Sequence, residues 1–288
     1  MPATPRRAGL PVIATYHTLF KEYLQHYAPF VPAAWLRSMA RRFSRAQCNA
    51  LNAVIVPSQA IHQRLSDYGV TSPLHILPTG IPLGYFAGSG RQAFRQRHGI
   101  DQQRPVALYV GRVAQEKNIG FLLDAVDLAR QALPAMLLLI AGEGPALGSL
   151  RASVARRGLS ANVQFLGYLD RRSELPYCYA AADVFVFASR TETQGLVLLE
   201  AMAAGLPVVA LAAMGTIDIL GAARWCRKTT RQPSRGSSAR SCATTICAVV
   251  WRATGVPTPA NGRTRRWREG WPSYTAASSI SGRSVGHD

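Results

Sequence analysis

Short runs of β-branched and apolar residues alternate with amphipathic stretches over residues 1–220, and this alternation limits the possible folds more than any other feature. The runs that predict strands are Pro11–Thr15, Val54–Val56, His75–Leu77, Val106–Val110, Met136–Ala141, Val163–Leu166, Val184–Phe187 and Pro207–Ala210. The stretches with helical spacing are Ala33–Ala50, Ser58–Tyr68, Gly120–Gln131, Ala146–Arg157, Ser173–Ala181 and Leu196–Ala204. Such alternation is typical of α/β folds with parallel sheets. We therefore predict a doubly wound parallel α/β fold.

The passage Pro82–Gly99 is rich in Gly, Ser and Arg and precedes the strongest strand, so we place a domain boundary near residue 100. Residues 101–220 then form a Rossmann-like domain suited to a nucleotide. Residues 1–100 hold too few strand and helix units for a complete Rossmann-like domain. We therefore expect two Rossmann-type domains, of which the first is incomplete.

Composition changes abruptly near Gly221. Residues 1–220 hold 21 Lys and Arg against 13 Asp and Glu, whereas residues 221–288 hold 12 against 2. No strand or helix period can be followed in this tail, which predicts disorder. Read two nucleotides later in GC-rich codons, the tail can encode a loop, a helix start and amphipathic helices, over Ala223–Arg235, Ala239–Cys247 and Arg266–Tyr274. We therefore predict a frameshift near residue 220, in which case the charge of the tail says nothing about partners.

One segment carries two glutamates eight positions apart. Glu192 lies in a polar loop, and Glu200 lies two turns into an apolar helix that begins near Gly195. The start of a helix presents unsatisfied N–H groups and partial positive charge, which suits a phosphate. We predict that the backbone N–H groups of Gln194, Gly195 and Leu196 meet a phosphate or a sugar between the two carboxylates. The alternative is a pair of solvated surface glutamates.

A second group of charged residues follows the Val106–Val110 strand. Arg112 and Lys117 leave the loop at the carboxyl end of this strand, where open α/β sheets bind their ligands. Two cations there can neutralise a diphosphate, and an arginine can engage its oxygens through two hydrogen bonds. The alternative is a solvated basic loop. No Asp-x-Asp motif occurs in the chain, so we predict no metal ion and no cofactor.

These segments together resemble the family 4, or group 1, glycosyltransferases, which have the two-domain GT-B architecture and an E-x7-E motif. The stretch TETQGLVLLEAMAAGLPVVA, residues 191–210, is most similar to the bacterial branch that glycosylates diacylglycerol and related lipids. The resemblance implies an enzyme that moves a hexose from a UDP- or GDP-sugar to a membrane lipid or a glycan, with retention of the anomeric configuration.

The resemblance also implies a role for each matching residue. Arg112 and Lys117 would hold the diphosphate of the donor, and Glu200 would accept hydrogen bonds from the ribose hydroxyls. Glu192 and His17 would serve the donor sugar near its reacting carbon, where a histidine could steady developing charge.

Further matches and departures concern the ends of the cleft. The turn at Gly167 corresponds to the place where such enzymes lodge the nucleobase, although a turn of this kind often only packs. The chain lacks the Gly-rich loop with which the family begins, and Pro82 stands where an aspartate is usual. We therefore expect a chain truncated at its start, and the sequence leaves the activity of this copy open.

The stretch Ala33–Ala50 interleaves arginines with Trp35 and Phe43. It predicts either a helix that lies on an anionic membrane or one whose apolar face meets the core. The five cysteines are scattered without metal-ligand spacing, which favours a reducing compartment. We expect a cytoplasmic protein that contacts the inner face of the cell membrane peripherally.

Two other functions stay open at this point. The formal net charge of +18 permits a non-catalytic protein that binds nucleic acid through its tail. Because the tail is expected to be out of frame, we predict no specific nucleic-acid partner. The Rossmann pattern also permits an NAD-dependent oxidoreductase, which ranks last because no G-x-G-x-x-G follows any strand.

Overall fold

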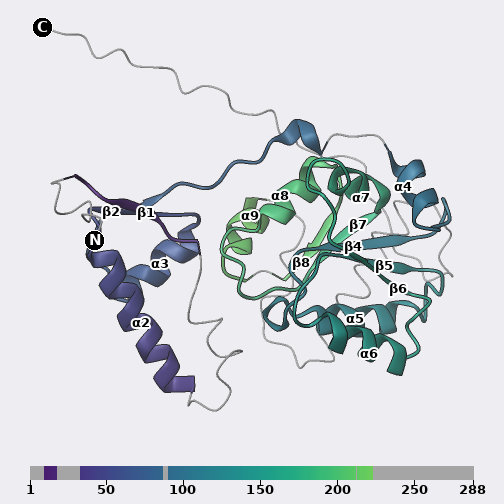
Figure 1. Cartoon of the computed structure of the whole chain (residues 1–288), viewed down its shortest axis with the longest axis horizontal. Coiled ribbons are helices and arrows are strands. Elements are labelled where there is room, and N and C mark those ends of the chain that lie inside the picture. The colour runs from purple at the N-terminus through teal and green to yellow at the C-terminus, as the bar shows by residue number, and fades with distance from the viewer. Residues whose placement is uncertain (1–9, 18–32, 87–89, 212, 223–288) are drawn as a thin grey trace, which may run out of the picture. The chain divides into compact units, whose positions relative to one another are not determined.

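The computed structural model describes residues 10–17, 33–86, 90–211 and 213–222 of the chain. Their strands form two sheets, one of three strands in the order β1-β2-β3 and one of five in the order β6-β5-β4-β7-β8 (Figure 1). Every recorded strand pairing in these sheets is parallel. The prediction of a parallel α/β fold is therefore confirmed. The tail from residue 223 onward, with its predicted disorder and frameshift, lies outside the described residues.

The smaller sheet consists of β1 (Ile13–Thr15), β2 (Ala53–Val56) and β3 (Leu74–Ile76). Two helices accompany it, α2 (Ala33–Asn49) and α3 (Gln59–Asp67). Its core is a small cluster of buried side chains from α2, β2 and α3, namely Cys48, Val54, Val56, Ile61, Leu65 and Tyr68. Helix α3 begins at this place because the Ser58 hydroxyl caps it, accepting a hydrogen bond from the N–H of Ile61.

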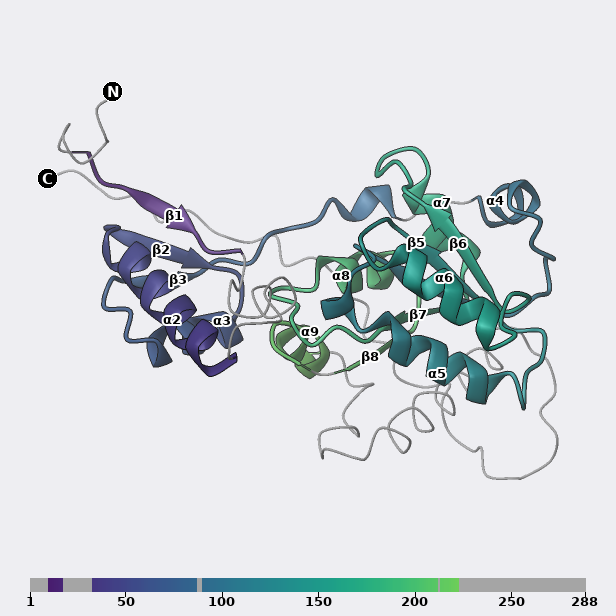
Figure 2. The same cartoon turned by 60° about the horizontal axis from the view of Figure 1, so that its bottom comes forward.

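The larger sheet consists of β4 (Val106–Val110), β5 (Leu137–Ala141), β6 (Val163–Gly167), β7 (Val184–Phe187) and β8 (Val208–Ala210). Its helices are α5 (Ile119–Ala129), α6 (Leu147–Arg156), α7 (Leu175–Ala181) and α8 (Leu196–Ala203). Every residue of β4, β5 and β7 is buried, as expected for central parallel strands covered by helices on both faces. Figure 2 shows α5 and α6 side by side against this sheet.

The passage before residue 100, which the sequence analysis treats only as a boundary, contains the 3₁₀ turn η2 (Leu83–Tyr85) and helix α4 (Arg91–Arg97). Phe86, Phe94 and Ile100 pack into the core of the larger sheet. That core therefore includes residues on both sides of the predicted boundary, and the division into domains stays a prediction. A further helix, α9 (Thr216–Ala222), closes the described chain.

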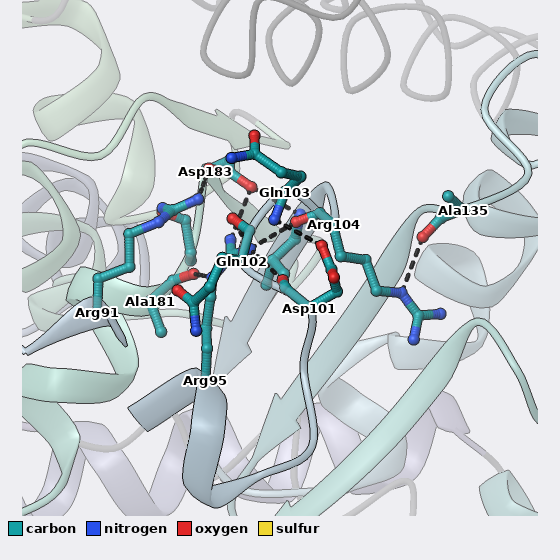
Figure 3. A network of polar contacts seen from close by, with 11 residues as sticks. Arg91, Arg95, Asp101, Gln102, Gln103, Arg104, Ala135, Ala181 and Asp183 are labelled. Carbon is teal, nitrogen blue, oxygen red and sulfur yellow. Dashed lines mark hydrogen bonds and ion pairs between the residues drawn. The ribbon is translucent and has the colours of Figure 1, made fainter. Parts of the chain in front are cut away.

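A buried arginine ties α4 to the amino end of the larger sheet (Figure 3). The Arg95 side chain is 0% exposed, and its Nη2 donates to Asp183 Oδ2 at 3.1 Å. The rest of its guanidinium donates to four main-chain carbonyls, those of Ala181, Asp101, Gln102 and Arg104. Burial lowers the pKa of Arg95, and the Asp183 carboxylate opposes this effect.

Asp183 is equally well satisfied. Its Oδ2 also accepts the Val106 N–H at 2.8 Å, and its Oδ1 accepts Arg91 Nη2 at 2.7 Å. A buried ion pair offsets the cost of desolvation only when hydrogen bonds occupy the remaining donors and acceptors. Arg95 and Asp183 meet this condition, so the network fixes α4 against the starts of β4 and β7.

No helix in the described part of the chain is both long and apolar enough to cross a membrane.

Candidate functional site

The loops that follow β4 and β7 meet at the carboxyl end of the larger sheet. The two strands are adjacent and parallel, with Ala107 paired to Val184, so residues that follow them lie close together. Lys117 follows β4 and Glu192 follows β7. Lys117 Nζ donates to Glu192 Oε2 at 2.9 Å, and the two side chains are 14% and 19% exposed. Two predicted site residues 75 positions apart are thus brought into contact.

The backbone of the loop after β4 is held by close packing against the loop after β5. Gly142 has φ of 136°, and a Cβ there would lie 2.0 Å from the Gly111 carbonyl oxygen. Only glycine permits this approach. The buried hydroxyl of Tyr109 donates to the Arg112 carbonyl at 3.0 Å. Burial raises the pKa of Tyr109, as do the carboxylates of Glu192 and Glu116, so this phenol stays a donor.

Arg112 is exposed on the same loop, which leaves it at the rim of the candidate site. Beside Lys117, Glu116 is buried, and its Oε1 has no hydrogen-bond partner among the described residues. Glu116 was not among the site residues predicted from the sequence.

Glu192 interacts with the start of α8. Its Oε1 accepts the Gly195 N–H at 3.2 Å, and the Gln194 N–H also stabilises the carboxylate. Burial acts to raise the pKa of Glu192, but the Lys117 ammonium and the two N–H groups outweigh it, so this pKa lies below its ordinary value. Glu192 therefore stays ionised between a cation and a helix end.

The backbone at the start of α8 favours glycine at position 195. Gly195 has φ of 78°, and a Cβ there would lie 3.1 Å from Ile219 Cδ1. The Gln194 side chain donates to the Thr79 carbonyl at 2.8 Å. Leu196 is the first residue of α8. The predicted contact of these N–H groups with a phosphate or sugar stays a prediction. In the structure, Glu192 itself uses the Gly195 N–H.

Glu200 forms a second cluster on the buried face of α8. Its side chain is 2% exposed. Tyr179 donates its hydroxyl to Glu200 Oε2 at 2.9 Å, and Arg171 Nη2 forms an ion pair with Oε1. Burial raises the pKa of Glu200, although the hydrogen bond from Tyr179 and the charge of Arg171 act to lower it. Neither Tyr179 nor Arg171 was predicted from the sequence as a site residue.

The loop that carries Arg171 is organised by its neighbour Asp170. The Asp170 carboxylate accepts the N–H groups of Arg172 and Ser173 and the Ser173 hydroxyl. These hydrogen bonds lower the pKa of Asp170. The Glu174 carboxylate accepts the Asp170 N–H at 3.0 Å, which closes the loop on itself. Gly167, at the start of the loop, accepts the Gly142 N–H at 2.7 Å and has φ of 73°.

His17 follows β1 and is exposed. Its main-chain carbonyl accepts the Thr193 hydroxyl at 3.0 Å. Thr193 directly follows Glu192, so the chain at His17 lies beside the loop that carries the first glutamate. The role of the imidazole stays a prediction. Within the described residues, no three His, Cys, Asp or Glu side chains gather as metal ligands would.

Comparisons with known proteins agree with the fold. The family described as glycosyl transferases group 1 matches residues 90–230, and glycosyltransferase family 4 matches residues 1–85. HepE of Anabaena, solved with UDP and glucose, has a TM-score of 0.67 at 22% identity, covering 87% of this chain and 68% of that one. WaaG, a glycosyltransferase involved in lipopolysaccharide biosynthesis, has a TM-score of 0.64 at 20% identity, covering 85% and 70%. At these identities the likeness shows the fold alone.

Curated relatives are more similar in sequence. Alpha-monoglucosyldiacylglycerol synthase of Streptococcus pneumoniae is 34% identical over 211 residues, which cover 71% of this chain and 47% of the relative. The synthase of the same name from Acholeplasma laidlawii is 30% identical over 216 residues, covering 72% and 54%. The chain thus spans about half the length of these relatives. With two family matches in order along an α/β fold of parallel sheets, the chain belongs to the family 4, group 1 glycosyltransferases of GT-B architecture.

Proposed function

We propose that this chain carries the donor-binding part of a retaining glycosyltransferase that moves a hexose from a nucleotide-diphospho-sugar to a membrane lipid such as diacylglycerol. One observation carries the proposal: Lys117, Glu192 and the Gly195 N–H converge at the start of α8. A cation, a carboxylate and a main-chain N–H thus meet at the carboxyl end of a parallel sheet, where α/β folds bind nucleotides.

The charges suit a leaving diphosphate. Lys117 and Arg112 would neutralise its oxygens, and Lys117 would exchange its ion pair with Glu192 for contact with a phosphate. Such an exchange conserves charge pairing, so it costs less than ordering a cation that had no partner. Placing fixed positive groups where charge develops in the transition state lowers the barrier.

The two acids suit the hydroxyls of the donor. An ionised carboxylate can only accept hydrogen bonds, and hydroxyls of a sugar or a ribose are donors. Glu192, ionised between Lys117 and the helix start, would receive the hydroxyls of the transferred sugar. Glu200 would receive those of the ribose. His17 would act on the sugar side, as the family resemblance implies.

The choice of a lipid acceptor rests on the names of the two synthases and on the surface of α2. Trp35, Met39 and Phe43 recur every four residues and are exposed, which gives an apolar stripe on one helix face. Arg41, Arg42 and Arg45 are exposed beside it. Such a surface suits an anionic bilayer. Cosedimentation with vesicles that contain anionic lipid tests this contact, which Trp35→Ala should weaken.

Nucleotide binding to the full chain tests the donor site. We expect UDP or GDP to raise the melting temperature, since a ligand that binds only the folded state stabilises it in proportion to the logarithm of its concentration. Lys117→Ala and Glu200→Ala should each weaken binding about tenfold or more, because each removes a hydrogen-bonding partner that carries a charge.

A matched control removes an acid from a helix of the same α/β unit, away from the candidate site. Asp124 on α5 forms an exposed ion pair with Arg157 at 2.6 Å, and Asp124→Ala should leave nucleotide binding unchanged. A folded chain that shows no shift with any common nucleoside diphosphate would sink the proposal.

A further inference from the structure

The two recorded partners of the Glu200 carboxylate differ in their freedom to leave. Tyr179 is fully buried, and its ring packs against Phe86 and Phe185 with centroids 5.6 Å and 5.9 Å away. Its hydroxyl is therefore fixed on Oε2. The Arg171 side chain is 59% exposed, so water can solvate its guanidinium if the ion pair with Oε1 breaks. Oε1 is thus the exchangeable side of a buried carboxylate.

The position of Arg171 is set by the loop rather than by Glu200. Asp170 accepts three hydrogen bonds from Arg172 and Ser173 and donates its own N–H to Glu174. This arrangement holds the backbone of Arg171 in place whether or not the guanidinium contacts Glu200. The side chain can therefore swing between the carboxylate and solvent without a change in the loop.

We propose that Arg171 is a specificity-determining residue of the nucleotide site and that it competes with the ribose hydroxyls of the donor for Glu200. This inference rests on the proposed function, in which the ribose meets Glu200. A ribose diol offers two donors to the carboxylate and can replace the guanidinium. A nucleotide without these hydroxyls cannot replace the guanidinium. Such a ligand therefore binds with the Arg171–Glu200 ion pair intact and gains no hydrogen bonds from Glu200.

The consequence is a coupling between Arg171 and the ribose hydroxyls. Breaking the Arg171–Glu200 ion pair opposes the binding of a ribonucleotide but not of a dideoxynucleotide. Removing the arginine therefore favours the ribonucleotide selectively. Loss of its positive charge also weakens attraction to the phosphates, but this effect is the same for both ligands, because their phosphates are identical. The ratio of the two dissociation constants isolates the competition.

The test measures binding of UDP and of 2′,3′-dideoxyuridine 5′-diphosphate to the full chain by calorimetry, for wild type, Arg171→Ala and Arg172→Ala. In Arg171→Ala, we expect the preference for UDP over the dideoxy ligand to rise about two- to fivefold, which is the range for an ion pair with an exposed partner. Arg172→Ala is the matched control, because it removes the same charge from the same loop. It should leave the preference at the wild-type value.

The outcomes separate the two proposals. If wild type binds UDP and Arg171→Ala leaves the preference unchanged or lowers it, Arg171 does not compete for Glu200 and only this inference fails. If wild type does not bind UDP but Arg171→Ala does, the competition is stronger than expected and the inference stands. If neither protein binds either ligand or GDP, both the inference and the proposed function are overturned.

Discussion

Both ends of the larger sheet carry ion pairs between cationic and acidic side chains, but the two sets differ in their exposure to solvent. At the amino end, Arg95 and Asp183 are buried. Main-chain carbonyls accept from the rest of the Arg95 guanidinium, and the Val106 N–H and the Arg91 guanidinium donate to Asp183. At the carboxyl end, Lys117 and Glu192 are partly exposed, and Arg171 covers the buried Glu200 with an exposed side chain. The first network is buried, whereas the cationic partners in the second are reached by solvent.

This difference follows from the geometry of parallel sheets. Loops at the carboxyl end are where such sheets bind ligands, so charged pairs there are accessible and their partners can be replaced. The amino end of this sheet is packed under α4. Of the three arginines that α4 carries, Arg95 is the buried one. We infer that the amino end serves stability and that ligand exchange, as proposed above, is confined to the carboxyl end.

The largest expected effect comes from breaking the buried network. Asp183→Ala leaves the Arg95 guanidinium buried without its counter-charge, and removing one partner of a buried pair typically costs about 3–5 kcal/mol. Chemical denaturation should show a fall of this size in the free energy of unfolding. A loss below about 1 kcal/mol would mean that Arg95 is satisfied by the four carbonyls alone.

Comparing the ends also shows what the sequence could predict. The strands β4 and β7 agree to the residue with prediction, because each is an unbroken apolar run bounded by Pro105 and Gly111 or by Asp183. The meeting of Lys117 with Glu192 was predictable too, since both follow strands of one parallel sheet. In these places local pattern and tertiary structure agree.

The misses are mainly arginines whose partners lie far away in the chain. Five of the seven residues of α4 are arginine or glutamine, so a helix with a buried face is hard to recognise there. Asp183, the partner of Arg95, lies 88 positions away. Arg171 lies 29 positions from Glu200. An arginine is usually exposed, and nothing within either segment indicates that it pairs with a buried acid.

A smaller effect on stability is expected at the carboxyl end of the larger sheet, and it depends on pH. The pKa of Glu192 in the folded chain lies below the ordinary value of 4.5. Its ionised form therefore contributes stability that is fully present above the unfolded pKa and lost as the pH falls through the folded pKa. Glu192→Gln should cost about 1 kcal/mol at neutral pH.

The gap in unfolding free energy between wild type and Glu192→Gln should close as the pH falls from 4.5 toward the lower folded pKa. Denaturant unfolding at several pH values in this range measures it. If burial rather than Lys117 dominated, the folded pKa would be raised, and the gap would shift in favour of the variant as the pH rises. That result would contradict the role of Lys117 as the counter-charge.

The smallest effect is expected from Arg91, which shares Asp183 with Arg95 but has a 39% exposed side chain. Water can replace the Arg91 guanidinium on Oδ1, whereas it cannot reach the buried Arg95. Arg91→Ala should therefore cost between about 0 and 1 kcal/mol, while Arg95→Met should cost several times more, because it leaves Asp183 without its buried cation. Denaturant unfolding of the two variants compares two cations of different burial that pair with the same carboxylate. Equal losses would show that charge alone, and not burial, sets the strength of the buried network.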